Sequence, residues 1–309
     1  MVNSDTDAIE QVAILVSPDR GDGIRSRFAL ALASFLGREI ELRNLSAERE
    51  EFAAEAELGR LPAERTQGLL AILSAEFAGR ADFAVLPKAS RRKKLLVSDM
   101  DSTVIGQECL DELADFAGLK AEISAITERA MAGELDFEGA LTARVGMLKG
   151  LGLEALEKCY ASRISLNPGA RTLVETMKAH GARTVLVSGG FTYFTSRVAM
   201  DAGFQDHRGN TLVDDGAALT GEVGMPILGR EAKLSALQEE AAGIGISLAD
   251  TLTMGDGAND LAMIEASGLG IAYHAKPIVA AKAHAAIQIT PLTTALYFQG
   301  YSANEFVEV

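Results

Sequence analysis

The sequence has 309 residues, of which 48% are hydrophobic and 23% are charged, and its formal net charge is -14. This composition is typical of a folded protein and excludes disordered, collagen-like and disulfide-scaffold classes. The acidic balance argues against nucleic acid as the main partner, because proteins that bind nucleic acids usually carry a basic face. A small phosphorylated ligand stays compatible, since it needs only a few well-placed cations and backbone N–H groups.

Cysteine usage and the N-terminus indicate the compartment. Cys109 and Cys159 are the two cysteines and form no C-x-x-C pair, which excludes a zinc ribbon or thioredoxin motif and fits a reducing cytoplasm. The start, MVNSDTDAIE, lacks the basic and apolar regions of a signal peptide. The apolar stretch 28–36 is far shorter than the ~20 residues of a membrane helix. We expect a cytoplasmic protein with no membrane partner.

The first ninety residues predict a small α+β unit. In chain order, the patterns indicate strands and helices at 12–17 (strand), 23–36 (helix), 38–45 (strand), 63–77 (helix) and 81–86 (strand). The segment 48–58 is ambiguous; if it holds a strand, the order is βαββαβ, a ferredoxin-like arrangement. No cluster of catalytic residue types lies here, so a regulatory, dimer-forming or structural role is expected, and a homodimer is left open.

A basic segment separates this unit from the rest. The sequence LPKASRRKK, at 86–94, holds a proline, a serine and five cations, which is typical of a solvated linker. Together with the chain length, it predicts two domains, 1–90 and 91–309.

The second domain predicts an α/β fold. Short apolar runs alternate with helical segments, which is typical of a Rossmann-like parallel sheet with helices on both faces; the runs are 94–99, 184–190, 250–256, 269–274 and 285–290. A mostly helical insertion at about 107–165 follows the first run and predicts a cap. The segment 210–223 has a hairpin pattern around Asp-Asp-Gly. Ligands of such sheets bind at the carboxyl ends of the strands.

Polar residues follow three of these runs. Asp99 and Asp101 leave the first strand with their side chains on one side, and Ser188-Gly189 precede a predicted helix in a pattern that can bind an anion. The turn 255–260 suits a hard cation with oxygen ligands. Each pattern alone is weak: acidic pairs are usually solvated, Ser-Gly-Gly is common turn chemistry, an Asx-rich turn often caps a helix, and a lone Lys233 is usually exposed.

The ordered combination of these patterns resembles the haloacid-dehalogenase-type phosphatase superfamily. Within it, DMDSTVIGQECLDELA at 99–114 resembles the start of the phosphoserine phosphatase group, as do the cap stretch 130–145, VSGGF, MGDGAND and the segment 274–277. The resemblance covers about 93–300. In this family an ACT-like domain often precedes the core, which agrees with the ferredoxin-like interpretation.

The resemblance implies roles for the reacting groups. Asp99 would be the nucleophile that forms an aspartyl-phosphate, and Asp101 would protonate the leaving oxygen and then deprotonate water. Mg²⁺ would be held by the Asp99 carboxylate, the Asp101 backbone carbonyl and Asp256. Lys233 would offset charge that develops in the transition state.

The resemblance also implies how a phosphate and its ester would be held. Ser188, Gly189 and Asn259 would bind the phosphate, and Asp260 would fix Lys233 or a metal-bound water. The substrate implied is O-phosphoserine, hydrolysed in the last step of serine biosynthesis.

Substrate choice is assigned to the cap. Glu108 would bind the ammonium group, Arg144 would bind the carboxylate as a bidentate fork, and Met131 and Phe137 would shield the site from water. For Met131 and Phe137 a plain role in the cap core is an equal alternative.

Three other functions are open at this stage. One is a phosphatase of the same superfamily that acts on another small ester. A second is a phosphotransferase with an acceptor such as homoserine. The third is a non-enzymatic switch module that is phosphorylated on aspartate, against which the second carboxylate, Asp101, argues.

Overall fold

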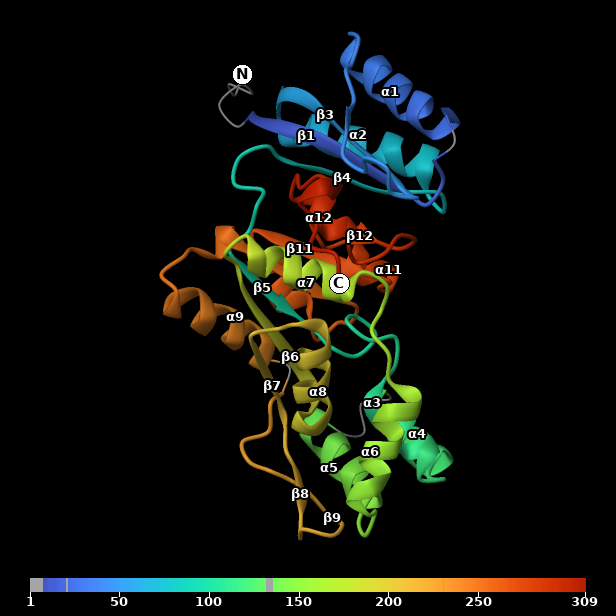
Figure 1. Cartoon of the computed structure of the whole chain (residues 1–309), viewed down its shortest axis with the longest axis vertical. Helices are drawn as coiled ribbons and strands as arrows, with labels where there is room; N and C mark the ends of the chain where they lie inside the picture. Colours follow the sequence, from blue (N-terminus) through green and yellow to red (C-terminus); the bar gives the residue numbers. More distant parts are fainter. Residues whose placement is uncertain (1–7, 21, 132–135, 230) are drawn as a thin grey trace.

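The computed structural model describes residues 8–20, 22–131, 136–229 and 231–309. The molecule is elongated, with the N-terminal unit at one end, a parallel sheet in the middle, and a helical cap with a hairpin at the other end (Figure 1). The predicted α/β class, with a small additional antiparallel unit, is confirmed.

The N-terminal unit has the βαββαβ order. Its elements are β1 (Ile9–Ser17), α1 (Asp22–Leu36), β2 (Arg43–Asn44), β3 (Phe52–Leu61), α2 (Ala63–Phe77) and β4 (Asp82–Pro87). They form an antiparallel sheet in the order β2-β3-β1-β4. The ambiguous segment thus holds the start of a strand. The predicted strand 38–45 shrinks to two residues, because Ile40 and Leu42 alternate to pack on the unit's core without pairing. Its ACT-like nature stays a prediction.

The central sheet has six parallel strands. They are β5 (Leu95–Ser98), β6 (Arg183–Phe191), β7 (Asp206–Asn210), β10 (Thr251–Gly255), β11 (Leu269–Tyr273) and β12 (Ala285–Ile287), in the order β12-β11-β10-β5-β6-β7. Five of them coincide with the predicted apolar runs. The sixth, β7, was not predicted as part of this sheet, because its sequence DHRGN is polar, as an edge strand tolerates.

Helices cover both faces of this sheet, as predicted. Side chains alternate along β5, so Leu96 faces the cluster that includes α7 (Ala170–Ala179), α8 (Thr192–Ala202) and α12 (Thr294–Phe298). Leu95 and Val97 face the opposite side, toward α9 (Ala232–Gly243) and α10 (Leu261–Ala266). Shorter helical elements are α11 (Pro277–Ala280), η1 (Leu248–Asp250) and η2 (Ala303–Glu305).

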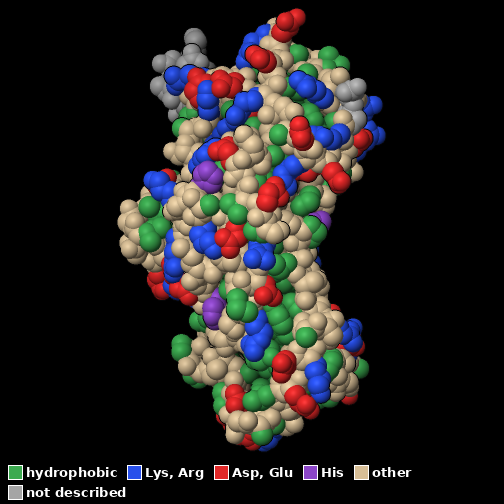
Figure 2. All heavy atoms as spheres, in the orientation of Figure 1, with side chains coloured by type: hydrophobic (Ala, Val, Ile, Leu, Met, Phe, Trp, Pro, Cys, Tyr) green, Lys and Arg blue, Asp and Glu red, His purple; other side chains and the backbone are tan. Residues whose placement is uncertain are grey.

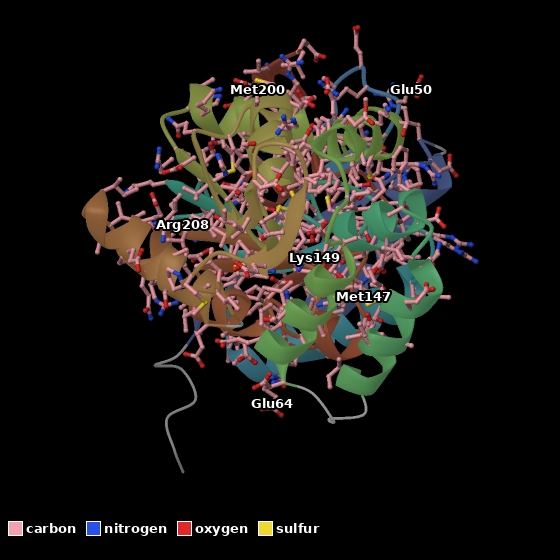
Figure 3. The ribbon with its side chains drawn as sticks, turned by 90° about the horizontal axis from the view of Figure 1, so that it is seen from below. Glu50, Glu64, Met147, Lys149, Met200 and Arg208 are labelled. Carbon is pink, nitrogen blue, oxygen red and sulfur yellow. The ribbon has the colours of Figure 1, made fainter. Side chains whose placement is uncertain are left out.

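The cap lies in the insertion after β5. Its helices are α3 (Cys109–Phe116), α4 (Lys120–Met131), α5 (Phe137–Met147) and α6 (Leu153–Arg163). The predicted hairpin is formed by β8 (Leu212–Asp214) and β9 (Leu219–Val223). Backbone hydrogen bonds fasten it to the cap, from Gly150 N to Leu219 O at 2.8 Å and from Leu219 N to Leu151 O at 2.9 Å. Lys149 lies at this junction when the molecule is seen from below (Figure 3).

Basic and acidic side chains are interspersed over the face seen in Figure 2, so the net charge of -14 is not gathered into one patch there. Among the described residues, no helix is both long and apolar enough to cross a bilayer.

The N-terminal unit and the core share buried contacts. One hydrophobic cluster includes Val12 and Ile14 of β1 together with Tyr297 and Phe306 near the C-terminus. The division into domains 1–90 and 91–309 therefore stays a prediction.

The Asp82 carboxylate is the polar centre of this contact. It is 4% exposed and accepts four hydrogen bonds from the segment after β12. The donors are Gln288 N at 2.8 Å, Ile289 N at 3.1 Å, Thr290 N at 2.8 Å and Thr290 Oγ1 at 2.6 Å. The two donors from Thr290 are buried, so the loss of their acceptor is costly, whereas Gln288 is exposed.

We expect Asp82→Ala to lower the free energy of unfolding by roughly 2–4 kcal/mol, because the buried N–H and hydroxyl of Thr290 lose their acceptor. Urea unfolding measures the change. The matched control is Asp215→Ala, which removes an exposed carboxylate bonded to Ala217 N and Ala218 N and should cost less than about 1 kcal/mol. Equal losses in the two variants would contradict the role of Asp82 in joining the units.

Candidate active site

A cavity of about 190 Å³ lies between the carboxyl ends of the central strands and the cap. Ten residues that the sequence predicted line it: Asp99, Asp101, Glu108, Phe137, Arg144, Ser188, Gly189, Lys233, Asp256 and Asn259. Asp260 lies behind this wall with no exposed surface. The predicted role of the Met131 side chain falls outside the described residues.

The Lys233 ammonium lies between two carboxylates. Its Nζ is 2.6 Å from Asp99 Oδ2 and 2.6 Å from Asp260 Oδ1, and the Lys233 side chain is only 5% exposed. Burial alone would lower the pKa of Lys233, but the two carboxylates raise it, so the amine stays charged. Burial and the neighbouring Asp260 raise the pKa of Asp99 well above its usual range, despite the lysine.

The turn after β10 holds Asp260 in place. Its Oδ2 accepts hydrogen bonds from Gly257 N at 3.0 Å and Asp256 N at 3.2 Å. A Cβ atom at Gly255 would lie 2.3 Å from Asp260 Cγ, so only glycine allows this approach. Burial, with the nearby Asp260, raises the pKa of Asp256 to about 6.

Asp101 is oriented by the cap and by strand β6. Its Oδ1 accepts from Cys109 N at 2.8 Å, and its Oδ2 accepts from Ser188 Oγ at 3.0 Å. Gly190 N in turn donates to Ser188 Oγ at 2.8 Å. Burial raises the pKa of Asp101, although these donors oppose the shift, which favours a carboxyl group able to carry a proton.

The cap side of the cavity carries one acid and one base. Ser102 Oγ donates to Glu108 Oε1 at 2.6 Å, and Ser102 has a φ of 53°. Although part of Glu108 reaches solvent, burial of its carboxyl group and the nearby Asp101 raise its pKa to about 7. Arg144 is half-buried and lines the cavity; its Nε donates to Ala140 O at 3.3 Å, and among the described residues no carboxylate forms an ion pair with it.

Phe137 closes the cavity from the cap. A Cβ atom at Gly189 would lie 3.5 Å from Phe137 Cζ, so the ring lies against the glycine. Phe137 is 41% exposed, which fits a residue at the rim better than one in the cap core.

The cavity also includes residues to which the sequence assigned no individual role: Leu110, Leu141, Gly190 and Phe191. Helical spacing could have found Leu141, because it follows Phe137 by four residues and precedes Arg144 by three, and so lies on the same face of α5. Leu110 has no comparable signal.

The carboxylates form a donor set for a cation. Oxygens of Asp99, Asp256 and Asp260 all lie within 4.8 Å of one another, and carboxylate oxygens suit a hard divalent ion. Both oxygens of Asp260 already bind Lys233 or backbone N–H groups. Both oxygens of Asp99 are engaged in the same way, Oδ1 by Met100 N at 2.7 Å and Oδ2 by Lys233 Nζ at 2.6 Å. Asp256, whose Oδ1 accepts from Thr103 Oγ1 at 3.4 Å, is the most available ligand of the three.

Phosphoserine phosphatases from other organisms are similar to most of this chain. The chain is 47% identical over 199 residues to the phosphoserine phosphatase of Polaromonas sp., which covers 63% of this chain and 84% of that protein. It is 41% identical over 243 residues to the phosphoserine phosphatase of Streptomyces coelicolor, which covers 78% of this chain but 59% of that protein.

Solved structures share the fold. A haloacid dehalogenase family hydrolase from Salmonella enterica serovar Typhi has a TM-score of 0.82 and 31% identity, covering 93% of this chain and 98% of that one. A phospho-aspartyl intermediate analogue of a phosphoserine phosphatase has a TM-score of 0.61 and 39% identity, covering 67% and 99%. The haloacid dehalogenase-like hydrolase family matches residues 96–265, more than half of the chain. With the cavity at the expected strand ends, the chain belongs to this family.

Proposed function

We propose that the protein is a Mg²⁺-dependent phosphoserine phosphatase, which hydrolyses O-phospho-L-serine to L-serine and phosphate. One observation carries the substrate: the cavity that contains Asp99 also contains Glu108 and Arg144, one acid and one base from the cap. A substrate with a phosphate, an ammonium and a carboxylate matches these three groups of residues. Relatives named as phosphoserine phosphatases, at 47% and 41% identity, support the same substrate.

Glu108 and Arg144 recognise the amino-acid part. Glu108, oriented by Ser102, accepts from the ammonium group, and Arg144 donates two parallel hydrogen bonds to the carboxylate. Phe137 excludes water from the cap side of the cavity.

The first half-reaction transfers the phosphoryl group to Asp99. A carboxylate oxygen of Asp99 attacks phosphorus, and the bond between phosphorus and the serine oxygen breaks. Asp101, whose raised pKa lets it carry a proton, gives that proton to the departing oxygen. Gly189 N–H, Ser188 and Asn259 hold the phosphoryl oxygens, and Lys233 balances their charge.

The second half-reaction returns the enzyme to its start. Asp101, now ionised, takes a proton from water, and the resulting hydroxide attacks phosphorus. The bond between Asp99 and phosphorus breaks, which releases phosphate. Asp260 keeps Lys233 beside Asp99 throughout.

The donor set fits a divalent cation. Asp99 and Asp256, with the backbone carbonyl of Asp101, would hold Mg²⁺. When bound, the ion neutralises the phosphoryl oxygens, so that an anionic carboxylate can approach an anionic substrate.

A cytoplasmic setting in serine biosynthesis agrees with this chemistry. Cys109 and Cys159 are both free and buried, as a reducing compartment requires of thiols that form no disulfide.

A substrate panel tests the function. With Mg²⁺, kcat/KM for L-phosphoserine should exceed that for phosphothreonine or p-nitrophenyl phosphate by roughly tenfold or more, because only phosphoserine fills both charged positions without an added methyl group. Added homoserine should leave phosphate release equal to serine release. A flat profile, or phosphate transfer to homoserine, would reject the proposal.

We expect Arg144→Ala to raise the KM for phosphoserine by about tenfold or more, since it removes hydrogen bonds between charged groups. Hydrolysis of p-nitrophenyl phosphate, which lacks a carboxylate, should change far less. The matched control is Arg163→Ala, another cap arginine, which pairs with Glu112 and Asp115 outside the cavity. Equal losses with both substrates would argue against carboxylate recognition by Arg144.

We expect Asp99→Asn to reduce kcat on the order of 10³-fold or more. Without metal, the variant should be more stable than the wild type by on the order of 1 kcal/mol at pH 8, because Asp99 has a raised pKa in the folded state. This gain should vanish toward pH 3, where Asp99 is protonated in the folded state and largely so in the unfolded chain, whose aspartate pKa is about 3.9.

With Mg²⁺ bound, the wild type should become more stable than Asp99→Asn, because only the wild type keeps both carboxylate ligands and gains stability from binding. Thermal unfolding at both pH values, with and without Mg²⁺, measures these effects. The same rise in Tm with Mg²⁺ in both proteins would remove Asp99 from the metal site.

A further inference from the structure

Strand β6 bulges where it carries the phosphate-binding residues. Val187 pairs with Arg208 and Phe191 pairs with Asn210, so the three residues 188–190 lie opposite Gly209 alone. The bulge brings Ser188 and Gly189 to the cavity wall. It also takes the Gly189 carbonyl out of the regular ladder, and a buried carbonyl needs another donor.

The Asn210 side chain supplies that donor. Its Nδ2 donates to Gly189 O at 2.8 Å, and the residue is only 1% exposed. The same amide pairs with Leu228, whose N–H donates to Asn210 Oδ1 at 2.7 Å and whose carbonyl lies 3.3 Å from Nδ2. Both ends of this amide are therefore bound to backbone groups.

The two partners of Asn210 belong to different segments of the site. Gly189 lies in the bulge of β6, residues 188–190, which carries the proposed phosphate-binding residues. Leu228 lies in the connection between the β8–β9 hairpin and α9, the helix that carries Lys233. The next residue, Gly229, approaches the Phe137 ring, since a Cβ atom there would lie 3.9 Å from Cδ1. Asn210 thus joins the β6 bulge to the segment that leads to Lys233.

We propose that Asn210 is a positioning residue for the phosphate, an inference that rests on the proposed function. Glycine has the greatest backbone freedom of any residue, so the Gly189 N–H needs an external restraint to stay aimed at a phosphoryl oxygen. The bond from Asn210 to the Gly189 carbonyl fixes the peptide between Gly189 and Gly190, and the Gly190 N–H of that peptide donates to Ser188 Oγ at 2.8 Å. Gly189 is thereby held between two fixed groups, which supplies this restraint. The bonds to Leu228 keep the Asn210 amide from rotating.

Asn210→Asp tests this role, because aspartate keeps the acceptor for Leu228 N–H and loses the donor for Gly189. We expect the dissociation constant of inorganic phosphate, measured by calorimetry with Mg²⁺ present, to rise about tenfold, which corresponds to about 1.4 kcal/mol. The KM for phosphoserine should rise in parallel. If Asn210→Asp does not fold, Asn210→Ser, which removes the amide without adding a charge, takes its place with the same expectation.

Gln299→Glu is the matched control. Gln299 is also only 1% exposed, and its side-chain amide also binds backbone groups: it accepts from Lys93 N and donates to Ala295 O. It lies outside the cavity. This variant should lower stability in urea without changing phosphate affinity. A folded Asn210 variant with the wild-type dissociation constant for phosphate would overturn the inference. Failure of the wild type to hydrolyse phosphoserine would instead overturn the proposed function, since phosphate binding is measured without turnover.

Discussion

The contact of the Lys233 ammonium with Asp99 and Asp260 is the interaction on which the rest of the site depends. Four carboxylates, those of Asp99, Asp101, Asp256 and Asp260, gather at one end of a parallel sheet, and a single buried ammonium lies between two of them. Burial raises the pKa values of Asp99, Asp101 and Asp256, and the neighbouring Asp260 adds to the rise at Asp99 and Asp256. A site with more carboxylates than ammonium groups attracts a cation and repels an anion. An anionic substrate therefore requires added positive charge beside the carboxylates.

The cap places one acidic and one basic side chain in the same cavity. Arg144 extends from α5 without a carboxylate partner among the described residues, and Glu108 is the residue just before the first turn of α3. Both residues face the cavity from the side opposite the strand ends. In the proposed function, the core therefore handles the phosphoryl group, while the cap determines which ester fits.

The sequence predicted the buried parts of the fold better than the exposed ones. Strands such as β5 and β10 are covered on both faces, so they appear as continuous apolar runs. Strand β7 lies at an edge and carries Asp206, His207 and Arg208, so its pattern does not differ from that of a loop. In the segment 38–45 the alternation correctly indicated burial, but pairing depends on a partner strand that no local pattern contains.

The same distinction applies to the site. Asp99, Ser188 and Asp256 could be placed together because parallel strands end at one edge of the sheet. The positions of Glu108 and Arg144 came from resemblance to a family. Asn210 could not be found, because its importance lies in a bond to a bulged carbonyl, and a bulge is a property of two paired strands.

The position of the N-terminal unit limits how it can act on the chemistry. It contacts the β12 side of the sheet and the C-terminal segment, whereas the cap and hairpin lie at the far end of the molecule (Figure 1). A molecule bound to this unit cannot obstruct the cavity sterically. Any influence must travel through the sheet, from Thr290 and the strands beside it to the turn that carries Asp256. Control from this unit would therefore be allosteric, changing turnover or the affinity for metal or substrate without occupying the substrate's place.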